Sequence, residues 1–289
     1  MDSVLVLMAQ PGSGAITSRV IEALHDHGGG APQWLSPGDA LEVEAFVRMP
    51  EFLIELQTLP IDAATVSLHN RRKRLLVADM DSTMIHQECI DELGVMAGVG
   101  ERVAAITARA MRGELDFEGA LIERVSLLKG LPASIIDTLI RDRITIMPGG
   151  KALLATMKAH GAYTALISGG FTAFTAHVAA TLGFHEHRAN TLEIEDGKLA
   201  GTVARPILGK NAKRAGLIEL AKRHGLGLDE TMAVGDGAND LPMLLAAGLG
   251  VALHAKPAVQ AQVKVRINHA DLTALLYLQG YRKEQFIGV

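Results

Sequence analysis

The stretch RLLVADMDSTMI, residues 74–85, decides the fold of this chain. Its apolar run from Leu75 to Ala78 predicts a buried strand, and Asp79 and Asp81 follow directly. Residues two apart in a strand point to the same face, so we expect the two carboxylates to lie close together and to repel each other. A divalent cation such as Mg²⁺, which prefers oxygen ligands, would offset that repulsion. The alternative is a strand that ends in a solvated polar turn.

Helices and short apolar strands are expected to alternate after Pro148. The segments 163–170 (YTALISGG) and 231–237 (TMAVGDG) are typical of buried strands, and the segments between them have helical spacing. Residues 191–203 contain two alternating runs around Asp196 and Gly197, which predicts a β-hairpin. The alternation indicates a parallel sheet with helices on both faces.

Polar groups end each of the central strands. Ser168 ends one strand, and Asp236 and Asp240 follow another. A later helix begins near Lys210 and Lys213, either of which offers a cation. Ligands of an open parallel sheet gather beyond the carboxyl ends of its strands, where helix N-termini also present free N–H groups. Carboxylates, a hydroxyl and a lysine on this rim predict a site for Mg²⁺ and a phosphoryl group.

The chain divides into three expected units. Residues 1–70 have the βαββαβ order of a ferredoxin-like unit, and residues 86–147 have the apolar spacing of four helices. Residues 71–85 and 148–289 then form the α/β core. The N-terminal unit resembles an ACT-type domain in its topology, and such domains often bind amino acids or pair with a copy of themselves.

The bulk composition is typical of an ordinary globular protein. The 289 residues are 48% hydrophobic and carry a net charge of −4, which gives no electrostatic footprint for nucleic acid. The run RRKR at 71–74 is typical of a solvated linker, and Cys89 is the only cysteine, so no intramolecular disulfide forms.

Residues 159–184 lack charged side chains, but Gly169 and Gly170 interrupt them, so we expect no membrane span and a cytoplasmic location. We interpret the HEH triplet at 185–187 as a polar turn.

Several motifs resemble those of the haloacid dehalogenase superfamily of phosphotransferases. DMDST at 79–83, Ser168, Lys213 and GDGAND at 235–240 occur in the order of that family. The resemblance covers roughly residues 74 to 275 and is closest to the phosphoserine phosphatases, because the helical insert also matches. The matching stretches of the insert are HQECIDELG and ARAMRGELDFEGALIERVSLLKGLP. The implied fold is a Rossmann-like parallel core with a helical cap inserted after the first strand.

The resemblance also implies catalytic roles. Asp79 is expected to attack phosphorus and to form an aspartyl phosphate. Asp81 is expected to protonate the leaving oxygen and then to accept a proton from the attacking water. Mg²⁺ would be held by the side chains of Asp79 and Asp236 and by the backbone carbonyl of Asp81. Asp240 would orient Lys213 or a water at the metal.

The same resemblance implies the substrate contacts. Residues expected to hold the phosphoryl group are Ser168, the Gly169 amide, Lys213 and Asn239. Glu88 and Arg124 match the family positions that contact the ammonium and the carboxylate of phosphoserine. Met111 and Phe117 would form apolar walls. From spacing alone, Arg124 would be an exposed helix residue.

We therefore expect a Mg²⁺-dependent enzyme that hydrolyses O-phospho-L-serine, the last step of serine synthesis in its family. One alternative is the same chemistry on another small phosphomonoester, or transfer of phosphate to an alcohol. A different alternative is a regulatory protein that senses an amino acid through residues 1–70. A purely structural role of that segment, in a homodimer, is the remaining interpretation.

Overall fold

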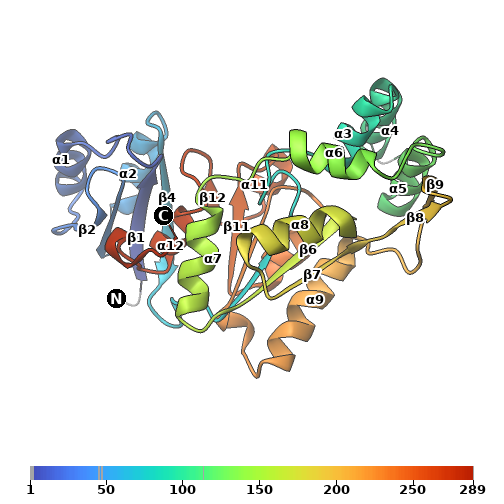
Figure 1. Cartoon of the computed structure of the whole chain (residues 1–289). Coiled ribbons are helices and arrows are strands. Elements are labelled where there is room, and N and C mark those ends of the chain that lie inside the picture. The colour runs from blue at the N-terminus through green and yellow to red at the C-terminus, as the bar shows by residue number, and fades with distance from the viewer. Residues whose placement is uncertain (1–2, 45, 47, 113, 289) are drawn as a thin grey trace.

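The computed structural model describes residues 3–44, 46, 48–112 and 114–288, without the side chains of Met111 and Lys210. It confirms the predicted α/β class, with a parallel sheet at the centre (Figure 1). The six strands lie in the order β12-β11-β10-β5-β6-β7, and every neighbouring pair is parallel. Their bounds are β5 Leu75–Ala78, β6 Tyr163–Phe171, β7 Glu186–Asn190, β10 Thr231–Gly235, β11 Leu249–Leu253 and β12 Val265–Ile267.

Helices cover both faces of this sheet because the central strands are apolar on both sides. Every residue of β5 is buried: Leu76 and Ala78 belong to one core cluster, whereas Leu75 and Val77 belong to another. The first cluster contains residues of α7 (Gly150–Ala159), α8 (Thr172–Leu182) and α12 (Ala274–Leu278). The second contains residues of α9 (Lys210–Arg223), α10 (Leu241–Ala246) and α11 (Pro257–Gln260).

The helical insert leaves the core after β5 and returns before α7. It consists of α3 (Cys89–Met96), α4 (Gly100–Met111), α5 (Phe117–Ser126) and α6 (Ile135–Asp142), and it lies beyond one end of the sheet (Figure 1). Its two connections lie side by side, since Ile85 and Ile146 form an antiparallel bridge and Met147 N donates to Met84 O at 2.9 Å. The insert can therefore move only as far as this paired linker allows.

The predicted hairpin is present and contacts the insert rather than the core sheet. It consists of β8 (Leu192–Glu195) and β9 (Lys198–Val203), joined by Asp196 and Gly197, which both have positive φ. Gly130 N donates to Leu199 O, and Leu199 N donates to Leu131 O, each at 2.8 Å. The hairpin thus extends the surface against which α5 is held.

The N-terminal unit has the predicted ferredoxin-like order. Its elements are β1 Ser3–Ala9, α1 Ser18–Asp26, β2 Gln33–Ser36, β3 Ala40–Glu44, α2 Met49–Leu56 and β4 Ile61–Ser67. The strands form an antiparallel sheet in the order β2-β3-β1-β4. One face of this sheet packs on α1 and α2, whereas Val4, Val6 and Met8 on the other face join the core cluster that contains α12. That second face is therefore covered by the core of the same chain.

Polar contacts also join the N-terminal unit to the core. The buried carboxylate of Asp62 on β4 accepts hydrogen bonds from the backbone N–H groups of Asn268, His269 and Ala270 at 2.7 to 2.9 Å. Arg71 pairs with Glu42 at 2.6 Å. These contacts fix the N-terminal sheet beside β12, the edge strand of the core.

The interpretation of residues 185–187 as a polar turn is wrong. Glu186 and His187 begin β7, the outer strand of the core sheet. His185 N donates to Thr164 O at 3.0 Å, and His187 Nδ1 lies 3.0 Å from Thr175 Oγ1. An edge strand is only partly covered, so its polar residues do not give the continuous apolar pattern of a central strand.

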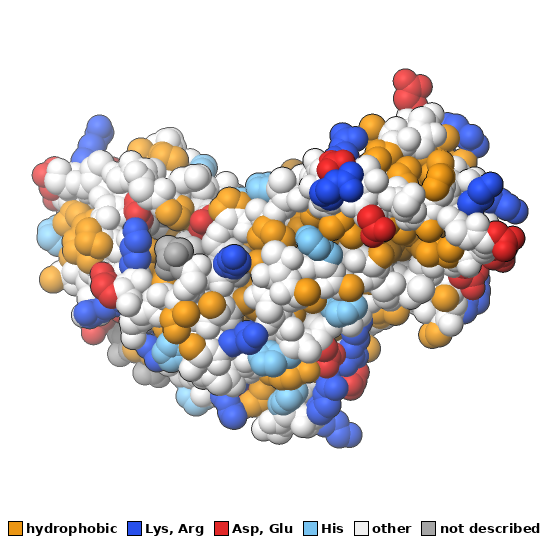
Figure 2. Space-filling view, in the orientation of Figure 1, with side chains coloured by type: hydrophobic (Ala, Val, Ile, Leu, Met, Phe, Trp, Pro, Cys, Tyr) orange, Lys and Arg blue, Asp and Glu red, His pale blue; other side chains and the backbone are white. Residues whose placement is uncertain are grey.

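Lys and Arg side chains are mixed with Asp and Glu across the face in Figure 2, whose upper edge is hollowed between the N-terminal unit and the helical insert. Over the described residues, every helix is too short or too polar to cross a membrane.

Candidate active site

The predicted site residues meet at the carboxyl ends of the three central strands. Asp79 follows β5, Ser168 lies near the end of β6, and Asp236 follows β10. These strands are neighbours in the sheet, and the helical insert lies beyond this end of them (Figure 1). The arrangement is the one expected for a ligand site in an open parallel sheet.

Asp79 and Asp81 do not lie on one face of a strand, so the expectation of a shared strand face is wrong. The strand ends at Ala78, and a turn follows in which Met84 N donates to Met80 O at 2.8 Å. Ser82 in this turn has a φ of 52°. Because the backbone has left the extended conformation, the period of two no longer applies and the two carboxylates point to different partners.

Asp79 is bonded through one of its oxygens. Its Oδ1 accepts from Lys213 Nζ at 2.6 Å and from Met80 N at 2.7 Å. Among the described residues, Oδ2 has no hydrogen-bond partner, which leaves this oxygen available for a reaction.

Lys213 lies buried between two carboxylates. Its ammonium is 2.6 Å from Asp79 Oδ1 and 2.6 Å from Asp240 Oδ1, and only 3% of its side chain is exposed. Asp240 Oδ2 accepts from Gly237 N at 2.9 Å, so both oxygens of Asp240 are already bonded. Asp240 therefore contacts Lys213 directly. The side chain of Lys210, the other candidate cation, is outside the described residues.

Three carboxylates share this small buried space. Oxygens of Asp79, Asp236 and Asp240 lie within 4.8 Å of one another. Burial raises the pKa of Asp79, and the nearby charge of Asp240 raises it further, although Lys213 opposes both effects. Burial, with the charges of Asp240 and Glu88, raises the pKa of Asp236 to about 7. The repulsion that the sequence predicted is present, but it acts among these three residues.

The donor set fits a hard divalent cation. Thr83 Oγ1 donates to Asp236 Oδ1 at 3.2 Å, and among the described groups no donor reaches Asp236 Oδ2 or the backbone carbonyl of Asp81. Carboxylate and carbonyl oxygens are the ligands that Mg²⁺ takes in proteins. One lysine cannot neutralise three buried carboxylates, so a cation there would be favourable.

Asp81 is held by the start of the insert and by β6. Its Oδ1 accepts from Cys89 N at 2.9 Å, and its Oδ2 accepts from Ser168 Oγ at 3.2 Å. Burial raises the pKa of Asp81, and the charge of Glu88 adds to the effect. A carboxyl with a raised pKa holds its proton more readily, as a general acid must.

The last residues of β6 form a compact polar segment. Ser168 Oγ accepts from Gly170 N at 2.8 Å, and a Cβ at Gly170 would lie 2.7 Å from Asp81 Oδ2, so a larger residue does not fit there. Phe117 of the insert contacts Gly169, where an added Cβ would lie 2.8 Å from the phenyl ring. Asn239 lines the same small cavity as Ser168, Gly169 and Lys213.

The insert presents charges of both signs to Asp81. Glu88 precedes α3 and accepts from Ser82 Oγ at 2.8 Å. Arg124 on α5 is half-buried, and its Nη1 donates to Thr107 Oγ1 at 3.3 Å. Burial lowers the pKa of Arg124, whereas the charges of Asp91, Glu88 and Asp81 oppose that shift. The side chain of Met111, the second predicted wall residue, is outside the described residues.

Comparison with known proteins agrees with this geometry. The sequence profile of the haloacid dehalogenase-like hydrolases matches residues 76–245, which is more than half of the chain. The chain belongs to this family. The match includes Asp79, Asp81, Ser168 and Asp236 and extends through the whole helical insert.

Relatives of this hydrolase include curated proteins and solved structures. A phosphoserine phosphatase of Streptomyces coelicolor is 45% identical over 80% of this chain and 57% of its own length. A phosphoserine phosphatase of Streptococcus thermophilus is 48% identical over 69% of this chain and 93% of its own length. The crystal structure of a haloacid dehalogenase family hydrolase from Salmonella enterica superposes with a TM-score of 0.85 at 32% identity, covering 98% of this chain and 99% of that one.

The match covers very different fractions of the length of each relative. The hydrolase spans only 57% to 65% of the length of three curated relatives, from Streptomyces, Haemophilus and Vibrio. Features of those longer proteins are therefore attributed to this chain only as proposals.

One residue that holds the site together was missed at the sequence level. Asn190 ends β7, is 2% exposed, and donates through Nδ2 to Gly169 O at 2.9 Å. Its Oδ1 accepts from Leu208 N at 2.7 Å. The side chain thereby joins residues 168–170 of β6 to the segment that leads into α9 and Lys213. An asparagine before a hairpin is typical of a turn, so no motif distinguished it.

Proposed function

We propose that this hydrolase is a Mg²⁺-dependent phosphatase that converts O-phospho-L-serine and water into L-serine and phosphate. The observation that supports the reaction most directly is the environment of Asp79, whose Oδ1 is held by a buried lysine while Oδ2 is free among the described residues. The two relatives named phosphoserine phosphatase support the substrate.

In this proposal Asp79 is the nucleophile. Its Oδ2 forms a bond to phosphorus as the bond from phosphorus to the serine oxygen breaks. Asp81 gives its proton to the departing oxygen, then takes a proton from the water that hydrolyses the aspartyl phosphate. Its raised pKa, which results from burial and from Glu88, suits both proton transfers.

Charge neutralisation is assigned to the surrounding groups. Lys213, Ser168, the Gly169 amide and Asn239 would hold the phosphoryl oxygens. Mg²⁺ would be held by the carboxylates of Asp79 and Asp236 and by the carbonyl of Asp81, and it would supply positive charge against the phosphoryl group. Asp240 would keep Lys213 in position through their contact of 2.6 Å.

Selectivity is assigned to the insert. Glu88 would pair with the substrate ammonium, and Arg124 would bind its carboxylate through two N–H groups. Phe117 and Met111 would line the apolar side of the pocket. Residues 86–147 would thus act as a cap on the catalytic core, residues 71–85 and 148–289.

The role of the N-terminal unit, the cellular location and the partners of the protein stay predictions. Residues 1–70 would serve as an ACT-like unit, and a homodimer through this unit would have to use a surface other than the sheet face that packs towards α12. The expectations of a cytoplasmic location and of no nucleic acid or membrane partner continue to rest on composition.

Phosphate release by the purified chain tests the substrate. O-phospho-L-serine is compared with phosphothreonine, phosphoethanolamine and an aryl phosphate, each with and without Mg²⁺. We expect Mg²⁺-dependent release with a strong preference for phosphoserine. Equal rates on all four substrates would keep the chemistry and exclude the proposed selectivity, and no release from any would exclude both.

A further inference from the structure

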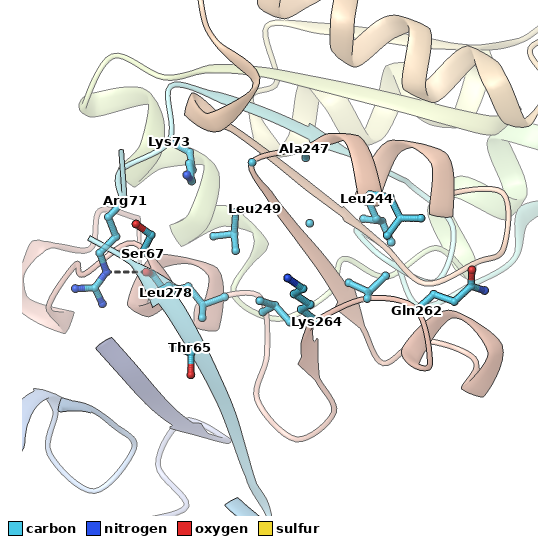
Figure 3. A pocket seen from close by; sticks show the side chains of 16 residues that line it. Thr65, Ser67, Arg71, Lys73, Leu244, Ala247, Leu249, Gln262, Lys264 and Leu278 are labelled. Carbon is cyan, nitrogen blue, oxygen red and sulfur yellow. Dashed lines mark hydrogen bonds between the residues drawn. The ribbon is translucent and has the colours of Figure 1, made fainter. Parts of the chain in front are cut away.

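A cavity far from the active site lies between the N-terminal unit and the core. Its volume is about 350 Å³, which is in the range of small-molecule sites. The walls come from the end of β4, the basic linker that follows it, the turn between α10 and β11, and residues 262–265 that lead into β12 (Figure 3). Both structural units contribute to it, and domain interfaces are common places for ligand sites.

The charged groups of this interdomain cavity all have the same sign. Arg71, Lys73 and Lys264 line it, and no carboxylate is found among the described residues that do so. Arg71 is occupied, since it pairs with Glu42 at 2.6 Å and donates to Leu278 O at 2.9 Å. The remaining positive charge belongs to Lys264 and to Lys73, whose ammonium is also close to the carboxylates of Asp229 and Glu230.

Lys73 and Lys264 differ in burial, and each can donate hydrogen bonds to an acidic group in the cavity. Lys73 is 9% exposed, and its ammonium makes one hydrogen bond, to Asp229 O at 2.6 Å. An ammonium has three donors, so further acceptors can be added. Lys264 is exposed, and Figure 3 shows it on the opposite side of Leu249 from Lys73. An acidic group in the cavity would therefore meet two cations of the core, one on each side of Leu249.

Most of the remaining lining residues are apolar, and Thr65, Ser67 and Gln262 are the polar ones. Leu244, Leu249, Val263 and Leu278 are buried or nearly so, and Leu245 is 61% exposed although it lines the same cavity. A free amino acid would bring an ammonium group, and no carboxylate of the described lining could receive it. The lining therefore matches a negatively charged group attached to an apolar chain.

We propose that the interdomain cavity binds a small amphipathic anion, a carboxylate on an apolar chain, with its acid group towards Lys73 and Lys264 and its chain on Leu244, Leu249 and Val263. Because Thr65 and Ser67 of the N-terminal unit also line the cavity, the ligand contacts both units and stabilises their contact. The site is independent of the phosphatase chemistry and does not rest on the proposed function.

Calorimetric titration of the full chain with sodium octanoate tests the proposal. Saturable binding to one site is expected, together with a rise in the melting temperature, since a ligand that binds only the folded state stabilises it. Lys264→Gln should weaken binding roughly tenfold, the size of one charge-assisted hydrogen bond. Lys222→Gln is the control: it removes an exposed lysine of α9 that does not line the cavity, so binding should be unchanged.

Two further variants separate the alternatives. Leu245→Asp changes an exposed rim residue, so the fold is expected to persist while octanoate binding is lost. Arg124→Ala should leave octanoate binding intact. The proposal is overturned if octanoate does not bind, if Lys264→Gln and Leu245→Asp bind it normally, or if Arg124→Ala abolishes binding, which would place the anion in the active site. Displacement of octanoate by L-serine would overturn the restriction to anions.

Discussion

Replacing Asn190 tests whether the site depends on a residue that no motif indicates. Asn190→Ala removes the hydrogen bond to Gly169 O at 2.9 Å and the one from Leu208 N at 2.7 Å. Both partners are in a partly buried region, where a lost hydrogen bond costs about 1 to 1.5 kcal/mol. The free energy of unfolding should fall by about 2 to 3 kcal/mol, or roughly 5 to 10 °C in melting temperature.

The catalytic effect of Asn190→Ala should exceed what lost stability explains. Gly169 loses the bond that holds its carbonyl, and a displacement of about 1 Å at a reacting site can cost on the order of a hundredfold in rate. We expect kcat/KM to fall between tenfold and a hundredfold, roughly, at a temperature where the variant is fully folded.

A second variant tests the donor to Gly169 O. Asn190→Asp keeps an acceptor for Leu208 N but sets a buried carboxylate oxygen against Gly169 O, so it should lose at least as much stability and activity as Asn190→Ala. Asn211→Ala, an exposed asparagine on α9, is the matched control. If Asn190→Ala lowers the melting temperature but leaves kcat/KM unchanged, the residue has no positioning role and the reasoning is refuted.

Three further predictions concern the catalytic centre. Asp79→Asn should abolish phosphate release because an amide cannot act as the nucleophile, and normal turnover would contradict the assignment. Arg124→Ala should lose its preference for phosphoserine while it still cleaves an aryl phosphate slowly, and equal losses on both substrates would count against a carboxylate contact. Asp236→Asn should melt at a higher temperature than the parent at pH 8 without metal, because burial raises the pKa of Asp236 to about 7 and ionisation above that pH costs folding free energy. Calorimetry should also show that Mg²⁺ raises the melting temperature of the parent but not of this variant, and an equal rise in both would exclude Asp236 as a ligand.

The central sheet could be predicted from sequence because its strands are buried on both faces. Continuous apolar runs such as Leu75 to Ala78 have few alternative structures, and the polar residues after them must meet at one edge of a parallel sheet. The edge strand β7 was missed for the opposite reason. Its pattern is polar and partly exposed, and its place is set by pairing with β6 rather than by its own residues.

Side-chain directions at the site were less predictable than the set of residues. Asp79 and Asp81 were expected to face each other, but the turn after Ala78 sends one towards Lys213 and the other towards Cys89 N. Tertiary contacts decided this turn, and the local sequence did not reveal them. The same holds for the packing of the N-terminal sheet towards α12, which joins residues far apart in the chain.

The most direct test of the account is mass spectrometry of the Asp81→Asn variant, quenched in acid shortly after mixing with O-phospho-L-serine and Mg²⁺. This variant keeps the nucleophile but lacks the carboxyl that protonates the leaving oxygen and activates water, so both steps are slowed. Because the nucleophile survives, we predict that part of the protein carries one phosphoryl group and that this group maps to Asp79. A variant that turns phosphoserine over without a phosphorylated form, or that carries the phosphoryl group on another residue, would contradict the proposed mechanism.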